Sequence, residues 1–217
     1  MFYPVTRLAV APLARAVYRP VVEGRANVPR HGAVILASNH LSFIDSAVIP
    51  LVAPRPVAFL AKAEYFAGSG VKGSLTRAFF TSIHAIPVER GTHASAQASL
   101  DAALEALQAG EAFGIYPEGT RSRDGRLYRG RTGVAWLALR AQVPVVPVAL
   151  QGTHDIQPIG SRRLRLAKVR VQFGRPLDFS DRIGTMSEGQ LRREVTDEIM
   201  DAIHTLSGQE RADRYNQ

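Results

Sequence analysis

The residues best suited to acid–base chemistry are His40 and Asp45, which lie five positions apart in the segment 38–45. This segment directly follows the apolar run 33–37, and open α/β sheets place their sites at the carboxyl ends of strands. A chain that turns there from strand to helix can fold the Asp45 carboxylate back onto a nitrogen of the His40 ring. The carboxylate would orient the ring and stabilise its protonated form, so that His40 can take a proton from an alcohol. The spacing also fits a simpler role, in which Asp45 only caps the helix that follows.

A second polar segment, 116–122, also follows an apolar run. Its Pro-Glu-Gly sequence favours a tight turn, in which Gly119 and Thr120 can present backbone N–H groups to a ligand. Arg121 adds a planar, permanently charged group suited to phosphate. A plain β-turn with exposed charges explains any one of these residues. A plain β-turn is a weaker explanation for the combination of Glu118 and Arg121 on either side of a glycine turn at the end of a strand.

Two basic runs lie farther along the chain. The first continues from Arg121 and fits either a solvated loop or the lip of an anion-binding cleft. The second is more typical of a solvated or membrane-facing surface. The runs comprise Arg123, Arg126, Arg129 and Arg131, and then Arg162, Arg163, Arg165, Lys168 and Arg170.

Apolar runs alternate with helix-like segments along the chain. Short continuous apolar runs are typical of strands buried on both faces, and intervening helices favour parallel pairing. We therefore expect a single α/β domain with a mostly parallel central sheet flanked by helices. The expected strands are 33–37, 57–61, 86–88, 112–116, 145–150 and 169–173, and the expected helices are 43–52, 71–82, 93–109, 132–141 and 187–206.

The two ends of the chain differ from this domain, which we expect to span 20–207. Residues 1–19 form a basic amphipathic pattern. This pattern predicts either a helix that lies in a membrane interface or a terminal helix packed on its own domain. Residues 208–217 are polar, and we expect them to form a frayed tail.

The composition fits a globular protein and excludes several kinds of site. The 217 residues include no cysteine, which excludes disulfides, thiolate metal sites and a cysteine nucleophile. The histidines show no metal-ligand spacing, and no P-loop or dinucleotide fingerprint occurs. The formal net charge of +8 favours anionic partners such as phosphorylated metabolites, anionic lipid, acidic carrier proteins or nucleic acid. No apolar run is long enough to predict a membrane-spanning helix.

Taken together, these segments resemble the glycerolipid acyltransferases of the 1-acylglycerol-3-phosphate acyltransferase family. Two specific motifs and two weaker ones occur in the family's order between about residues 20 and 175, which makes 20–207 an expected acyltransferase domain. The matching positions are Asn39-His40-x4-Asp45, 86–90, 116–122 and 143–148, together with Lys62.

The resemblance implies transfer of a fatty acyl group from a thioester donor to a hydroxyl of a phosphorylated glycerol acceptor. His40 would be the general base and Asp45 its orienting partner. Backbone N–H groups of Gly119 and Thr120 would stabilise the oxyanion. Arg90, Arg121 and Lys62 would clamp the acceptor phosphate. Glu118 would position the acceptor or organise those basic residues. No cofactor or metal is implied, since acyl-CoA or acyl-carrier protein enters as co-substrate.

The acceptor that fits best is lysophosphatidic acid, acylated for phospholipid biosynthesis by a peripheral protein at the cytoplasmic face of the cell membrane. Glycerol 3-phosphate and other lyso-lipids stay open as acceptors, as do the type of donor and its chain length. One interpretation from another class is a Ser-His-Asp hydrolase using Ser38 or Ser42, although no nucleophile elbow supports it. Another is a non-catalytic protein that binds anionic membranes or nucleic acid through its charge, but no RNA-binding signature is present and we expect no nucleic-acid partner.

Overall fold

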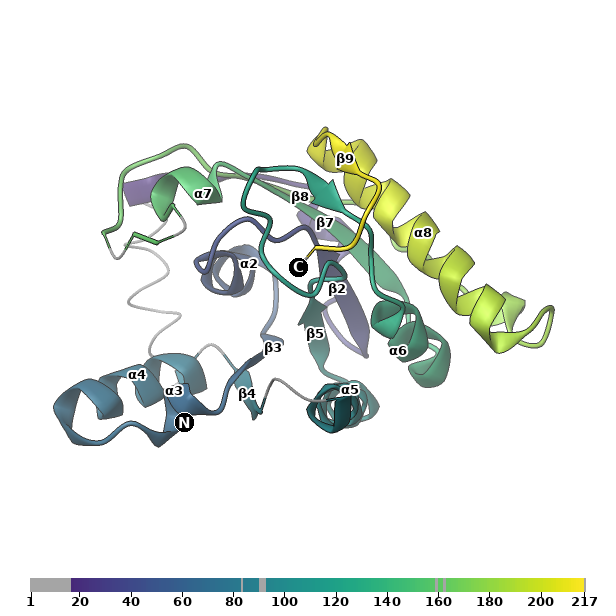
Figure 1. The fold of residues 1–217 in the computed structure, drawn as a ribbon, viewed down its shortest axis with the longest axis horizontal. Helices are drawn as coiled ribbons and strands as arrows, with labels where there is room; N and C mark the ends of the chain where they lie inside the picture. Colours follow the sequence, from purple (N-terminus) through teal and green to yellow (C-terminus); the bar gives the residue numbers. More distant parts are fainter. Residues whose placement is uncertain (1–16, 83, 90–92, 159, 162, 217) are drawn as a thin grey trace.

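The computed structural model describes residues 17–82, 84–89, 93–158, 160–161 and 163–216. Within these residues, the main sheet has the strand order β1-β8-β7-β2-β5-β3-β4, and every neighbouring pair is parallel except β7 and β8 (Figure 1). The predicted α/β fold with a mostly parallel sheet is therefore confirmed. The strands of this sheet are β1 (Val21–Glu23), β2 (Val34–Ser38), β3 (Val57–Lys62), β4 (Ala85–Val88), β5 (Ala112–Ile115), β7 (Val145–Gln151) and β8 (Arg170–Phe173).

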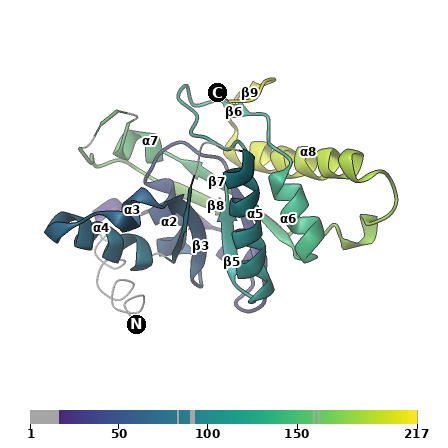
Figure 2. The ribbon, with the colours of Figure 1, turned by 60° about the horizontal axis from the view of Figure 1, so that its bottom comes forward.

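Helices cover both faces of the sheet. Helices α5, α6 and α8 pack on one face, and α2 and α7 pack on the other (Figure 2). None of the helices in the described ranges is long and apolar enough to span a bilayer. The helices are α2 (Asp45–Val52), α3 (Glu64–Ala67), α4 (Gly70–Ser82), α5 (His93–Gln108), α6 (Gly133–Ala141), α7 (Thr153–Ile156) and α8 (Glu188–Ser207), with 3-10 turns η1 (Arg25–Asn27) and η2 (Ser180–Arg182).

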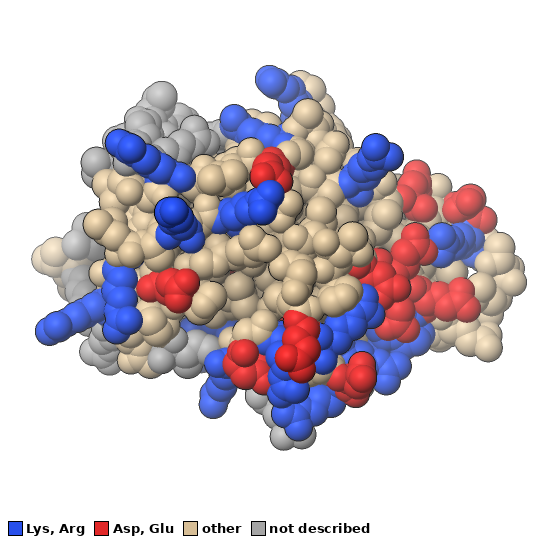
Figure 3. Space-filling model, turned by 90° about the horizontal axis from the view of Figure 1, so that it is seen from above, with Lys and Arg blue, Asp and Glu red and all other residues tan. Residues whose placement is uncertain are grey.

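The strand order brings three loops to one edge of the sheet. Strand β2 lies between β7 and β5, and both pairings are parallel, so the carboxyl ends of the three strands are neighbours. The loop after β5 and helix α7 after β7 lie along the upper side of the molecule in Figure 1. Figure 3 looks onto that side, where basic side chains are widely spread while most acidic ones gather towards the right and the lower edge. Open α/β sheets bind their ligands outside the carboxyl ends of the strands, so we expect a site at this edge.

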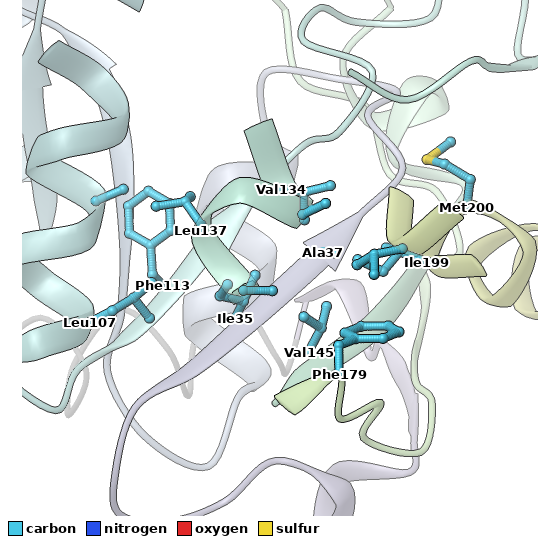
Figure 4. Packing of buried hydrophobic residues seen from close by; sticks show 14 of the residues in the cluster. Ile35, Ala37, Leu107, Phe113, Val134, Leu137, Val145, Phe179, Ile199 and Met200 are labelled. Atoms are coloured by element: carbon cyan, nitrogen blue, oxygen red, sulfur yellow. The ribbon is translucent and has the colours of Figure 1, made fainter. Parts of the chain in front are cut away.

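The central strand β2 is apolar because helices cover both of its faces. Alternate residues of a strand point to opposite sides. Accordingly, Ile35 and Ala37 pack with α5, α6 and α8, whereas Val34 and Leu36 pack with the α2 side. Figure 4 shows Ile35 and Ala37 among side chains from the helices and neighbouring strands. This double burial gives the continuous apolar run that the sequence shows.

The structure describes residues 208–216 near one end of the chain, but not residues 1–16 at the other. Residues 1–16 lie outside the described residues, so the amphipathic helix expected at 1–19 stays a prediction. The expectation of a frayed tail at 208–217 is wrong for residues 208–216. Strand β9 (Arg211–Ala212) pairs in parallel with β6 (Leu127–Tyr128), and both Ala212 and Asn216 are buried. The tail is polar because it binds another polar loop through its backbone and side chains.

Candidate active site

His40 and Asp45 are in direct contact. His40 Nδ1 lies 2.9 Å from Asp45 Oδ2, and the same oxygen accepts the N–H groups of Leu41 at 2.7 Å and Ser42 at 2.8 Å. Asp45 is the first residue of α2 and is fully buried. The carboxylate therefore holds both the turn and the ring. Because an ionised carboxylate only accepts hydrogen bonds, Nδ1 carries the hydrogen and Nε2 keeps a lone pair.

Tyr116 covers one face of the His40 ring. The ring centroids are 3.8 Å apart and the planes differ by 8°. The Tyr116 hydroxyl lies 2.9 Å from Ser46 Oγ. Burial, helped by the negative charge of Asp45, raises the pKa of Tyr116 well above its ordinary value, so the phenol is neutral. One face and the Nδ1 edge of the ring are thus covered, and 15% of the His40 side chain is exposed.

Glu118 links the two motif loops from inside the protein. One of its carboxyl oxygens accepts the His40 N–H at 3.0 Å, and the other accepts the Tyr128 N–H at 2.9 Å. Burial raises the pKa of Glu118 to about 7, against the lowering effect of these two backbone bonds. The side chain is fully buried, so it has no direct access to an acceptor in this conformation, and its predicted role in organising the basic residues stays a prediction. Glu118 instead ties the loop after β5 to the loop after β2.

Gly119 forms the turn of the second motif, as its position after Pro-Glu predicts. Its φ of +80° is in the left-handed region, and its N–H donates to the Tyr116 carbonyl at 2.9 Å. This N–H is therefore used to close the turn, and the prediction that it stabilises an oxyanion is wrong for this conformation. Thr120, the next residue, is exposed.

The predicted cations emerge at the same sheet edge as His40. Arg121 is exposed beyond the turn, and Lys62 is exposed at the carboxyl end of β3, which pairs with β5. Arg90 lies outside the described residues. The structure therefore brings His40, Arg121 and Lys62 to one edge of the sheet.

Asn39 has a structural task that its place in the first motif does not reveal. Its amide oxygen accepts the Leu150 N–H at 2.8 Å, and its amide nitrogen donates to the Leu150 carbonyl at 3.0 Å and to Gln209 Oε1 at 2.7 Å. The amide thus replaces a backbone pair between β2 and β7 just before His40. Asn39 is fully buried at the end of an apolar strand, and buried amides are normally hydrogen-bonded, so its position indicates a structural role.

The serines proposed as alternative nucleophiles are directed elsewhere. Ser42 Oγ donates to the Gln157 carbonyl, and Ser38 Oγ donates to the Asn39 carbonyl, each at 2.9 Å. Both residues are fully buried. Neither hydroxyl is therefore presented to the His40 ring as a Ser-His-Asp triad requires.

An apolar groove lies between α2, α7 and the segments around Tyr18 and Val169. Its volume is about 480 Å³, including the space open to solvent, and Ile44, next to the buried Asp45, is among its lining residues. Its lining is entirely apolar except for the ring of a tyrosine. The lining residues are Tyr18, Pro20, Ile44, Ala47, Val48, Leu51, Val52, Ile156 and Val169.

Known proteins with similar sequences and structures include several acyltransferases. The family model "Acyltransferase" matches residues 19–151. A 1-acyl-sn-glycerol-3-phosphate acyltransferase of Limnanthes douglasii is 33% identical over 148 residues, 68% of this chain and 51% of that protein. The enzyme of the same name from Bacillus subtilis is 30% identical over 162 residues, 74% of each chain. The chain thus spans about half the length of the Limnanthes relative.

A solved structure agrees over a longer stretch. The crystal structure of the 1-acyl-sn-glycerophosphate (LPA) acyltransferase PlsC from Thermotoga maritima has a TM-score of 0.66 and 26% identity. The alignment covers 94% of this chain and 82% of that one. The similarity therefore extends well beyond the short motifs.

Proposed function

The chain belongs to the acyltransferase family, and from this premise we propose that it transfers a fatty acyl group from a thioester to the free hydroxyl of lysophosphatidic acid, forming phosphatidic acid. The similar proteins, which are 1-acyl-sn-glycerol-3-phosphate acyltransferases, support this acceptor and reaction. The contact between His40 and Asp45 supports the chemistry, because it supplies a base at a sheet edge that also carries cations.

The observation that carries the mechanism is the 2.9 Å contact between His40 Nδ1 and Asp45 Oδ2. With Nδ1–H donated to the carboxylate, the lone pair on Nε2 removes the proton of the acceptor hydroxyl as its oxygen attacks the thioester carbonyl carbon. The ring becomes an imidazolium, and the Asp45 carboxylate stabilises this charge. No covalent acyl-enzyme forms.

The second half of the reaction returns the enzyme to its starting state. The tetrahedral intermediate collapses, the carbon–sulfur bond breaks, and the imidazolium gives its proton to the departing thiolate. The products are an ester and a free thiol, and the His40 ring is neutral again. We assign the stabilisation of the oxyanion to the Thr120 N–H, since the Gly119 N–H already donates to the Tyr116 carbonyl.

We assign the acceptor phosphate to the cations of the same sheet edge. Arg121 offers a planar fork that matches phosphate oxygens, and Lys62 adds a second positive charge. Arg90, outside the described residues, remains a proposed third cation. Binding the phosphate here places the acceptor hydroxyl towards His40, which converts binding energy into orientation.

The groove beside α2 is the site that we propose for the donor's acyl chain. Its lining on the α2 side extends from Ile44, next to the partner of the catalytic base, to Val52 at the last turn of the helix. At 1.5 Å per residue, this stretch corresponds to about 12 Å of apolar surface. Burial of methylene groups along it would stabilise the bound thioester.

We propose that the protein works as a peripheral protein on the cytoplasmic face of an anionic membrane. In the segment 163–168, Leu164 is 56% exposed and Leu166 is 77% exposed. The basic residues Arg163, Arg165 and Lys168 beside them are exposed as well. Exposed leucines between cations fit a lipid surface, because the leucines can enter the acyl boundary while the cations meet headgroup phosphates.

The test of this function is a product analysis by mass spectrometry. Purified protein is incubated with acyl-CoA or acyl-carrier protein and with lysophosphatidic acid, glycerol 3-phosphate or a neutral lyso-lipid. We expect phosphatidic acid, a His40→Ala variant slower by about 10²–10⁴, and a normal rate for His31→Ala, which removes an exposed histidine. Failure to esterify any phosphorylated acceptor, or a His40→Ala variant with normal turnover, would refute the proposal.

A further inference from the structure

The residues after α8 run back over the loop that follows β5. Gly208, with φ +65°, ends the helix, and we call the following residues 209–216 the strap. Strand β9 in the strap pairs with β6 in that loop, and the two lie side by side in Figure 2. Further backbone bonds join Leu127 N–H to the Glu210 carbonyl at 2.8 Å and Arg129 N–H to the Arg214 carbonyl at 3.0 Å. The strap is therefore attached along most of its length.

The first residue of the strap contacts the loop that carries His40. Gln209 Oε1 accepts a hydrogen bond from the Asn39 amide at 2.7 Å, and Gln209 Nε2 donates to the Gly125 carbonyl at 2.6 Å. Asn39 immediately precedes His40, whereas Gly125 belongs to the loop after β5. One side chain thus joins the two motif loops from outside.

The other end of the strap contacts the turn that carries Arg121. The amide nitrogen of Asn216, a buried residue, donates to the Arg121 carbonyl at 3.0 Å and to the Thr120 carbonyl at 3.5 Å. The Asn216 carbonyl accepts a bond from Arg131 Nη2 at 3.3 Å. The side chain of Arg131 in turn lies against Gly119. Asn216 is therefore bound to both sides of the turn.

Tyr215 adds a second attachment at the same end. The guanidinium groups of Arg129 and Arg131 lie 5.4 and 5.7 Å from the centre of its ring, and its hydroxyl accepts a bond from Arg193 at 3.3 Å. Cations over an aromatic face are attracted to it. The ring thus keeps two arginines at fixed places beside the turn.

The geometry of the peptide group connects Asn216 to His40. A peptide unit is planar, and its carbonyl and N–H point in opposite directions. The Arg121 carbonyl and the Ser122 N–H belong to one such unit. Asn216 holds the carbonyl on one side, while the Ser122 N–H donates to the His40 carbonyl at 2.8 Å on the other side. The orientation of this single peptide therefore depends on both the strap and the His40 loop.

From these contacts we propose that the strap fixes the register of the His40 loop against the Thr120–Arg121 turn, and that Asn216 is the positioning residue for the turn. The effect on catalysis rests on the proposed function, whereas the effect on the turn itself does not. Without the Asn216 amide, the peptides on either side of Arg121 lose their fixed orientation. The turn then presents the Thr120 N–H and the Arg121 side chain less often in the geometry that binds the acceptor.

The kinetic test uses two variants of Asn216 and one matched control. Asn216→Ala removes both donated bonds, and Asn216→Asp keeps the shape but sets a carboxylate against two carbonyl oxygens. Arg211→Ala, on the same strap, removes only an exposed ion pair with Asp201. We expect the KM for lysophosphatidic acid to rise about tenfold in Asn216→Ala and at least as much in Asn216→Asp. In the two Asn216 variants, the KM for the thioester should stay within about twofold of wild type. In Arg211→Ala, the KM values for the thioester and for lysophosphatidic acid should both stay within this limit.

A second readout separates the strap from the proposed function. Hydrogen exchange of peptides that span 119–123 should be faster in Asn216→Ala, while exchange of β2 peptides and the Tm stay close to wild type. If local exchange is faster in a protein that acylates nothing, the role of the strap in holding the turn is supported and the proposed function is refuted. Unchanged exchange together with an unchanged acceptor KM would refute the role of the strap. So would a general loss of stability in which kcat and both KM values change together.

Discussion

Replacing Asp45 by Asn tests the catalytic pair while leaving the fold intact. The amide oxygen can take the place of Oδ2 and accept hydrogen bonds from the His40 ring and from the Leu41 and Ser42 N–H groups. The amide nitrogen then takes the place of Oδ1, which has no hydrogen-bond partner among the described residues. We therefore expect the turn and the ring orientation to be retained while the negative charge is lost, although the buried amide N–H groups without a partner would lower the stability by about 1–3 kcal/mol.

The size of the expected effect follows from the contact distance. The 2.9 Å contact from nitrogen to oxygen places the centres of charge of the carboxylate and the imidazolium about 4 Å apart. At an effective dielectric constant of about 20, two unit charges at this distance attract each other by about 4 kcal/mol. This attraction exists only when the ring is protonated, as it is in the transition state of the proposed reaction. Because about 1.4 kcal/mol corresponds to a factor of ten in rate, we expect kcat to fall about 10³-fold.

The assay follows thiol release from the acyl donor at saturating lysophosphatidic acid, with Asp45→Asn, His40→Ala and the double variant measured together. Because the two residues act as one unit, the double variant should be about as slow as His40→Ala alone. Circular dichroism and the Tm provide the control for folding. An Asp45→Asn variant within about threefold of wild type would show that the carboxylate does not stabilise the transition state. Losses that simply multiply in the double variant would show that the residues act independently.

Four further changes test other parts of the structure. Burial raises the pKa of Glu118 from 4.5 to about 7, so its contribution to folding is complete below the lower value and is lost as the pH rises through the higher one. In urea unfolding at several pH values, the stability of wild type relative to Glu118→Gln should therefore shrink by on the order of 3 kcal/mol across this range, and a constant difference would contradict the shift. Gly119→Ala should lower the free energy of unfolding by about 1–2 kcal/mol, because φ is +80° and the new Cβ would lie 2.9 Å from Arg131 Nε. Val48→Phe fills the groove beside α2 and should shift donor preference towards shorter acyl chains in a competition assay; an unchanged preference would place the chain elsewhere. Replacing Leu164 and Leu166 together by Ser should weaken sedimentation with anionic vesicles at least about tenfold without changing the Tm, and unchanged binding would exclude this segment as the lipid contact.

The sequence was sufficient for the central sheet because its signal is local. Strands β2 and β7 are enclosed on both faces, so they appear as continuous apolar runs that end within a residue or two of the predicted bounds. Strand β1 is only three residues long and partly exposed, and its partner β8 lies almost 150 positions away. No local pattern could identify such a strand.

The contact between His40 and Asp45 was also predictable, because a five-residue turn from strand to helix limits where the carboxylate can go. The task of Glu118 was not. A glutamate between a proline and a glycine looks exposed, and only the packing of β6 over it shows that it is buried. In the same way, the polar residues 209–216 resemble a solvated end until β6 and Asn39 are seen beside them.

The stacking of His40 on Tyr116 makes the reaction centre asymmetric. The phenol ring covers one side of the imidazole, so an approaching hydroxyl can reach Nε2 only within the ring plane or from the opposite side. Under the proposed function, an acceptor whose phosphate binds Arg121 must bring its hydroxyl to this open side of the ring. We expect the mirror-image acceptor, bound at the same guanidinium, to direct its hydroxyl towards the phenol or out into solvent. We therefore expect the protein to distinguish the two enantiomers of its acceptor through a flat aromatic wall rather than through a polar contact.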